Sequence, residues 1–128
     1  MTTQNLKLEK EKFKSEFKNR IKIYILKLIT HIEGLPQTKI YQIVSNQLLR
    51  SGTSIGANYF EARAASSKND FINFFTHALK SANESKFWLE ILTEVNHNNV
   101  KETKFLLKEV VEIANVLASS ILTMKGKK

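Results

Sequence analysis

Lysine is the residue type whose spacing most clearly suggests chemistry in this sequence. Five lysines near the N-terminus recur at every third or fourth position, which places them along one side of a helix. They are Lys7, Lys10, Lys14, Lys18 and Lys22. Like charges at this spacing disfavour a helix by roughly 0.2–0.5 kcal/mol per pair, and a merely solvated face usually mixes both signs. A row of ammonium groups suits phosphate contact, so RNA or DNA is the expected partner.

A second lysine group and the chain end add to this basic character. These residues are Lys101, Lys104 and Lys108, with a basic tail over residues 125–128. Only three of the 20 basic residues are arginine, the residue that reads bases most often. We therefore expect salt-sensitive binding with weak sequence preference. The alternatives are solvated helix faces, an acidic protein partner or anionic lipid.

Catalytic and metal-binding arrangements are weakly supported. Ser54, His77 and Asp70 provide the residue types of a hydrolase triad, but the sequence lacks a nucleophile elbow and a glycine-rich oxyanion loop. Glu94 and His97 have the Glu-x-x-His spacing of di-iron helical bundles, but no second such pair accompanies them. We therefore expect no enzymatic activity, no metal site and no cofactor.

Composition limits the class of protein further. The chain has 128 residues, a net charge of +8, no cysteine, four glycines and one proline. This length fits one domain, the lack of cysteine excludes disulfides, and scarce turn residues argue against a β-sandwich. The longest apolar stretch, residues 21–32, is shorter than the roughly 20 residues that span a bilayer. We expect no membrane contact and, without a targeting signal, a cytoplasmic location.

Apolar residues at helical spacing predict the elements that position these side chains. Helices are expected at about residues 5–33, 38–64, 68–95 and 100–124. Ser67 suits the N-cap of the third helix. Because the connections are short, consecutive helices should be antiparallel neighbours. The expected fold is all-α, a single antiparallel up-down-up-down four-helix bundle over residues 1–128.

The first and last predicted helices carry more apolar residues than one core stripe requires. The expected stripe of the first helix consists of Phe13, Phe17, Ile21, Tyr24 and Leu28. However, seven of the nine residues in the range 21–29 are apolar or aromatic. The surplus residues of the last helix are Leu106, Val111 and Ile113. We interpret both surpluses as a subunit interface, and a thick core with a few exposed aliphatic side chains is the alternative.

The second predicted helix carries a polar line beside its apolar stripe. The line consists of Gln47, Ser51, Ser54, Asn58 and Glu61. Gly52 and Gly56 lie one turn apart on another side, where small residues permit close approach of a helix. Antiparallel pairing about Ala65 would set Ser54 near His77, Asn58 near Asn73 and Glu61 near Asp70. The line is a binding site or, the interpretation we favour, a hydrogen-bonded seam between helices or subunits.

Two ordered blocks of residues in the second and third predicted helices form a specific motif. The first runs from Gln47 to Ala62, and the second from Ser67 to Leu89. Their marker residues are Arg50, Ser54, Asn58, Glu61, Asp70, Glu84 and Trp88. The motif resembles a bacterial four-helix-bundle family named for members encoded in intervening sequences of 23S ribosomal RNA genes, over roughly residues 13–122. The resemblance implies that the marker residues organise the bundle and its interfaces.

The same resemblance has implications for assembly and function. It implies a protomer that forms a ring-shaped homopentamer, and a basic protein that binds ribosomal RNA without established enzymatic activity. A related branch, the accessory variability determinant of diversity-generating retroelements, binds a reverse transcriptase and nucleic acid. Together with the lysines, the resemblance predicts a non-enzymatic oligomer that binds RNA through its first and last helices. The alternative is an adaptor for a protein such as a reverse transcriptase.

Overall fold

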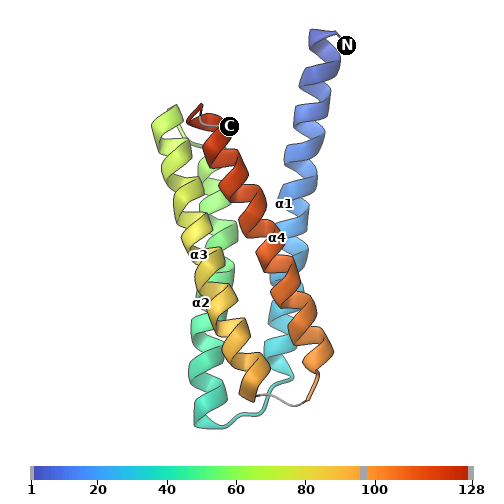
Figure 1. Cartoon of the computed structure of the whole chain (residues 1–128), viewed down its shortest axis with the longest axis vertical. Coiled ribbons are helices and arrows are strands. Elements are labelled where there is room, and N and C mark those ends of the chain that lie inside the picture. The colour runs from blue at the N-terminus through green and yellow to red at the C-terminus, as the bar shows by residue number, and fades with distance from the viewer. Residues whose placement is uncertain (1, 96–97, 127–128) are drawn as a thin grey trace.

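The computed structural model describes residues 2–95 and 98–126, and it confirms the four predicted helices. They are α1 (Thr3–Glu33), α2 (Lys39–Arg63), α3 (Lys68–Val95) and α4 (Val100–Met124) (Figure 1). Each helix begins and ends within two residues of the expected position, and the two described ranges contain no strand. Three residues discussed above, His97, Lys127 and Lys128, lie outside those ranges.

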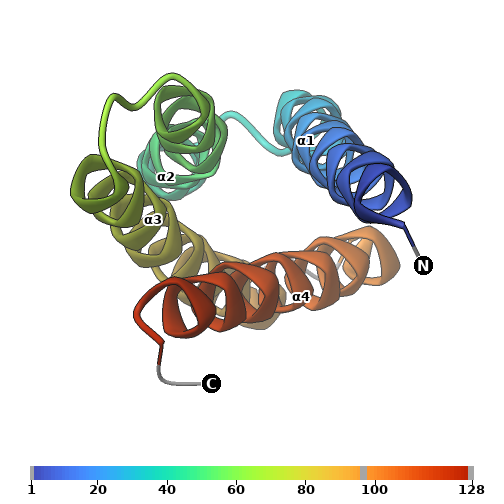
Figure 2. The same ribbon diagram turned by 90° about the horizontal axis from the view of Figure 1, so that it is seen from above.

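The helices form an antiparallel bundle in which sequence neighbours are neighbours in space. Figure 2 shows α1 between α2 and α4, with α3 on the opposite side. The core receives fully buried leucines from every helix, among them Leu28, Leu48, Leu89 and Leu117. α2 and α4 both pack extensively on α3, whereas α1 has the lightest packing and its N-terminal turns extend beyond the other helices (Figure 1).

The buried stripe of α1 is shorter than predicted. Phe17, Ile21, Tyr24 and Leu28 are buried, but the side chain of Phe13 is 55% exposed, so that part of the prediction is wrong. The N-terminal turns of α1 extend beyond the other helices (Figure 1), and Phe13 lines a cavity between α1 and the end of the bundle. Periodicity identifies which side of a helix is apolar, but it does not tell how far the partner helices extend alongside it.

The interpretation of the surplus apolar residues of the last helix as a subunit interface is also wrong for two of the three residues. Leu106 and Ile113 are completely buried, and Val111 is partly buried. α4 contacts both α3 and α1, so its buried face is wider than one stripe and includes these positions. The surplus of α1 is different, because Ile23 is 45% exposed and Leu26 is 53% exposed. A subunit interface on α1 therefore stays a prediction.

Candidate nucleic-acid interface

The two glycines of α2 allow this helix to approach α1 closely, as their spacing predicted. A Cβ atom at Gly52 would lie 2.4 Å from Cδ2 of Leu28, and one at Gly56 would lie 2.7 Å from Cδ1 of Ile25. Carbon atoms in contact are normally about 3.5–4.0 Å apart. Only glycine therefore fits this crossing without a shift of the neighbouring side chains.

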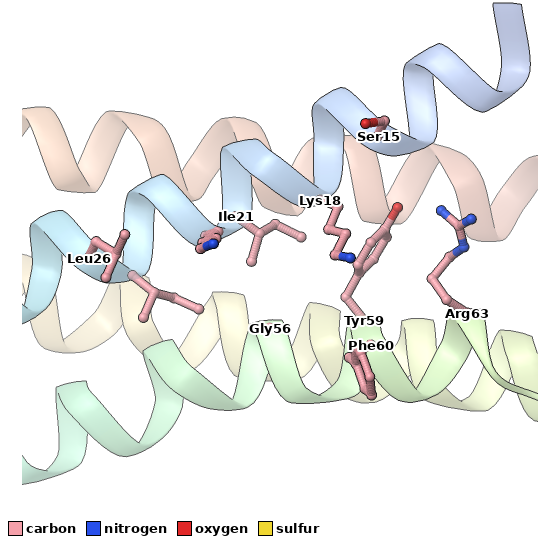
Figure 3. Close-up of a pocket in the computed structure, with 10 residues that line it drawn as sticks. Ser15, Lys18, Ile21, Leu26, Gly56, Tyr59, Phe60 and Arg63 are labelled. Atoms are coloured by element: carbon pink, nitrogen blue, oxygen red, sulfur yellow. The ribbon is translucent and has the colours of Figure 1, made fainter.

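A groove runs along the surface between α1 and α2, next to this crossing. Its volume is about 430 Å³. The apolar floor comes from Ile21, Ile25, Gly56 and Tyr59, and the rims come from Ser15, Lys18, Lys22, Leu26, Phe60 and Arg63. In Figure 3, Lys18 and Ile21 extend from α1 toward α2, and Arg63 extends from α2 toward α1. We call this feature the α1–α2 groove.

The α1–α2 groove carries positive charge that no carboxylate neutralises. Lys18, Lys22 and Arg63 take part in none of the ion pairs found among residues 2–95 and 98–126. No acidic side chain is among the residues that line the groove in the described structure. The ordinary consequence of such clustering is repulsion, which an anion held between the cations would relieve. The groove is therefore chemically suited to a phosphate group.

The five lysines of α1 that recur at every third or fourth position, from Lys7 to Lys22, form what we call the α1 row. Three of them, Lys7, Lys10 and Lys14, lie outside the α1–α2 groove. Lys10 and Lys14 line a second cavity of about 630 Å³, where α1 diverges from the end of the bundle, and its aromatic lining is mostly buried, with only Phe13 exposed. Lys14 forms an ion pair with Glu11 at 3.7 Å, and Lys7 is exposed on the projecting turns. Residues four apart on an α-helix are offset by about 40° around its axis. The lysines along the row therefore come to lie in different surroundings.

The lysines of α4 lie on a different face of the molecule. Lys101, Lys104 and Lys108 are exposed, opposite the buried stripe of α4. Between them and the α1 row lies the α1–α4 seam, where Arg20 donates hydrogen bonds to Glu109 at 2.9 and 2.7 Å and also pairs with Glu112. The hydrogen bond from the guanidinium of Arg20 lowers the pKa of Glu109. The two lysine groups therefore form separate surfaces.

Two of the five residues in the polar line of α2, Ser51 and Ser54, form the hydrogen-bonded seam against α3 that we favoured. The Ser85 hydroxyl donates to the Ser51 hydroxyl at 2.8 Å, and Ser81 donates to Ser54 at 2.9 Å. Ser54 thus meets Ser81, and the predicted pairing with His77 is wrong by one helical turn. Helical side chains lean toward the N-terminus of their own helix, so the side chains of antiparallel neighbours lean in opposite directions along the bundle. Each α2 residue consequently meets an α3 residue farther from the connection.

Five of the seven marker residues of the motif occupy this seam and its edge. Arg50 pairs with the carboxylate of Glu84 at 2.5 Å, and the same carboxylate accepts a hydrogen bond from the Trp88 indole at 3.2 Å. Asn58 donates to the Ser54 backbone carbonyl and hydroxyl within α2. These bonds join or stiffen α2 and α3, which fits an organising role.

The other two marker residues, Glu61 and Asp70, are exposed near the connection between α2 and α3. The Asp70 backbone amide donates to the Ser67 hydroxyl at 3.1 Å, which confirms the predicted N-cap of α3. His77 is exposed, and Ser54 is bonded to Ser81 instead. The residue types of a hydrolase triad are thus not assembled. Among the described residues, no three His, Asp or Glu side chains are placed to hold a metal ion.

Sequence reasoning missed Phe60, Arg63 and Ser15 of the α1–α2 groove. A signal for the first two was present, because continuing the line of Gly52 and Gly56 by further turns of the helix leads to Phe60 and Arg63. That line faces α1. None of the described helices is long and apolar enough to cross a bilayer.

Comparisons with known proteins agree with the helical architecture. The profile of one protein family, described as 23S rRNA-intervening sequence protein, matches residues 13–119. A solved structure from Bacteroides thetaiotaomicron, described as a protein with unknown function from the S23 ribosomal protein family, is 34% identical in sequence. The similarity covers 84% of this chain and 96% of that chain, with a TM-score of 0.77. No curated protein matches significantly.

Proposed function

Because this chain belongs to the 23S rRNA-intervening sequence protein family, we propose that it is a non-enzymatic protein that binds RNA. The association of the family with 23S ribosomal RNA genes makes ribosomal RNA the proposed target. The observation that carries the proposal is the cluster of unpaired cations, Lys18, Lys22 and Arg63, at the α1–α2 groove. Phosphate contacts by such cations provide most of the affinity in nucleic-acid binding that lacks sequence specificity.

The α1 row extends this cluster toward the projecting end of the helix. From Lys7 to Lys22 the row covers about 22 Å of helix, at 1.5 Å per residue. A nucleic-acid backbone lying along α1 would therefore meet several ammonium groups in succession. The separate face with Lys101, Lys104 and Lys108 provides a second contact surface, which suits a folded RNA that touches the protein at more than one place.

We further propose that the protomers assemble into the ring-shaped homopentamer that the family resemblance implies. Ile23 and Leu26 on α1 are exposed aliphatic residues available for such contacts. Five copies would multiply the +8 charge of each chain and raise the affinity for RNA through multivalent binding. Light scattering at micromolar concentration tests this proposal, and a mass of 14.7 kDa would contradict it.

Fluorescence anisotropy with short single-stranded RNA, duplex RNA and duplex DNA, across a salt series, tests RNA binding. The test variant is Lys14→Glu/Lys18→Glu/Lys22→Glu. Its matched control, Lys68→Glu/Lys80→Glu/Lys86→Glu, makes the same charge change on α3. We expect salt-dependent binding with preference for RNA, which the α1 variant weakens at least tenfold more than the α3 variant. No binding at low salt, or equal loss in both variants, would contradict the proposal.

The second candidate function is that of an adaptor for a protein such as a reverse transcriptase. It is favoured by apolar side chains exposed near one end of the α2–α3 pair, where Ile40 is 65%, Ile43 52% and Val95 40% exposed. The Tyr41 hydroxyl donates to the Val95 carbonyl at 3.0 Å and holds these segments together. If this patch binds the partner, Ile43→Glu will abolish capture of the partner and leave RNA affinity unchanged.

A further inference from the structure

We infer that the α1–α2 groove binds an unpaired stretch of RNA, holding a base against its apolar surface and the adjoining phosphates on its cationic rims. This inference rests on the proposed RNA binding and specifies the form of RNA that the groove accepts. The combination that carries it is an apolar floor, an exposed aromatic ring and three cations without ion pairs, all within one groove.

Each part of the groove matches one part of a single-stranded nucleotide. The Phe60 ring is 63% exposed on the α2 rim of the groove, and it presents an apolar face on which a base can lie. Lys18, Lys22 and Arg63 surround that surface and can contact the phosphates on either side of the base. Stacking on protein aromatic rings combined with a basic groove is the general mode of single-strand recognition.

A duplex could contact the cationic rims of the groove but not its apolar surface. The bases of a paired helix are stacked on one another inside it, so a duplex offers phosphates and groove edges to a protein surface but no free base face. The lysines of the rims would contact duplex and single strand alike. The apolar face of the Phe60 ring would gain only from the single strand, because only that form can remove it from water by stacking.

The dimensions of the groove argue against a protein helix as its occupant. An α-helix with side chains is about 10 Å wide, and one turn rises 5.4 Å, so a single turn occupies about 420 Å³. The groove has a volume of about 430 Å³, which is room for about one turn. A flat base with its neighbouring phosphates fits such a site better than an amphipathic helix, which needs several turns to bury an apolar face.

The test compares a fluorescein-labelled 12-nucleotide single-stranded RNA with the blunt duplex of the same sequence, by anisotropy with the full chain. The variant Phe60→Ala removes the exposed ring, and Phe87→Ala is the matched control, since Phe87 is also an exposed phenylalanine, on α3. We expect Phe60→Ala to weaken single-strand binding about tenfold and duplex binding less than twofold. We expect Phe87→Ala to change neither affinity more than twofold. Circular dichroism and light scattering check the fold and mass of each variant.

The possible outcomes separate this inference from the proposed function. If single strand and duplex bind equally and Phe60→Ala changes neither, RNA binding stands and the inference is overturned. If no RNA binds to the unaltered protein at low salt, the proposed function itself fails. If Phe60→Ala instead lowers the mass of an oligomer, the groove is a contact between copies of this chain, and the inference is likewise overturned.

Discussion

The close crossing of α1 and α2 makes a pair of glycine substitutions a sharp test of the packing. Alanine at either position would gain about 1 kcal/mol in helix stability relative to glycine. At Gly52 the new Cβ would lie 2.4 Å from Cδ2 of Leu28, about 1 Å too close. Leu28 is fully buried, so it cannot move into free space, and overpacking of this kind costs about 1–3 kcal/mol. We expect Gly52→Ala to destabilise the protein by about 1 kcal/mol.

Replacing Gly56 by alanine should not destabilise the protein as the change at Gly52 does. Its Cβ would lie 2.7 Å from Cδ1 of Ile25, but Ile25 is only half-buried and lines the open α1–α2 groove. The end of that side chain can turn into the groove at small cost, so the helix gain dominates. We expect Gly56→Ala to be neutral or to stabilise the protein by about 0.5 kcal/mol. The two variants should thus differ by about 1.5 kcal/mol.

Urea unfolding at a fixed protomer concentration, followed by the fluorescence of the single tryptophan, Trp88, and by circular dichroism, measures this difference. A double-mutant cycle of Gly52→Ala with Leu28→Val tests whether the clash is with Leu28, because valine lacks the Cδ2 atom that the new Cβ would overlap. We expect the double variant to be more stable than the sum of the single changes predicts. Equal stability of the two alanine variants, or strict additivity in the cycle, would refute the packing argument.

Three further predictions concern groups away from the α1–α2 groove. The Arg20 guanidinium lowers the pKa of Glu109, so this pair contributes stability above the ordinary glutamate pKa of about 4.3 and loses it as pH falls. Glu109→Gln should cost about 1 kcal/mol at pH 7 and flatten the acid limb of a pH–stability profile. Burial lowers the pKa of His31, whose Nε2 lies 2.8 Å from the Thr103 hydroxyl, so stability should fall as pH drops below about 6.5. His31→Gln should remove that dependence in denaturation measurements between pH 7 and 5. Ser85→Ala removes a fully buried hydroxyl that bonds to α2, and it should lower the urea midpoint by an amount equal to about 1 kcal/mol.

The sequence predicted which side of α2 forms the seam with α3, but it did not predict which residues of α3 this side contacts. The spacing of Ser51 and Ser54 placed them on one side of α2, and both are bonded to α3. Counting residues from the connection gave His77 as the neighbour of Ser54, whereas Ser81 is the neighbour found. The register depends on the direction in which side chains lean and on how two surfaces interlock, and neither quantity is a property of one helix alone.

The α1–α2 groove was predictable only in part for a similar reason. The lysine spacing indicated the α1 rim, and the two glycines indicated a close neighbour for α2. Joining them requires knowing that the glycine side of α2 faces α1, which brings Arg63 and Lys18 into the same groove (Figure 3). Such a pairing of distant residues arises from packing of the whole core, so a local pattern does not contain it.

The sequence by itself determined the number of helices, their ends and most of their buried faces, because helical periodicity and capping are local properties of the chain. Only the tertiary structure decided that Phe13 is exposed and that Leu106 is buried, since burial depends on where the partner helices end and how widely they contact one another. It also decided that the lysines of α1 and α4 form separate surfaces. The position of each charged residue along the chain is known from the sequence. Which of these charges share a surface depends on how each helix is rotated about its own axis.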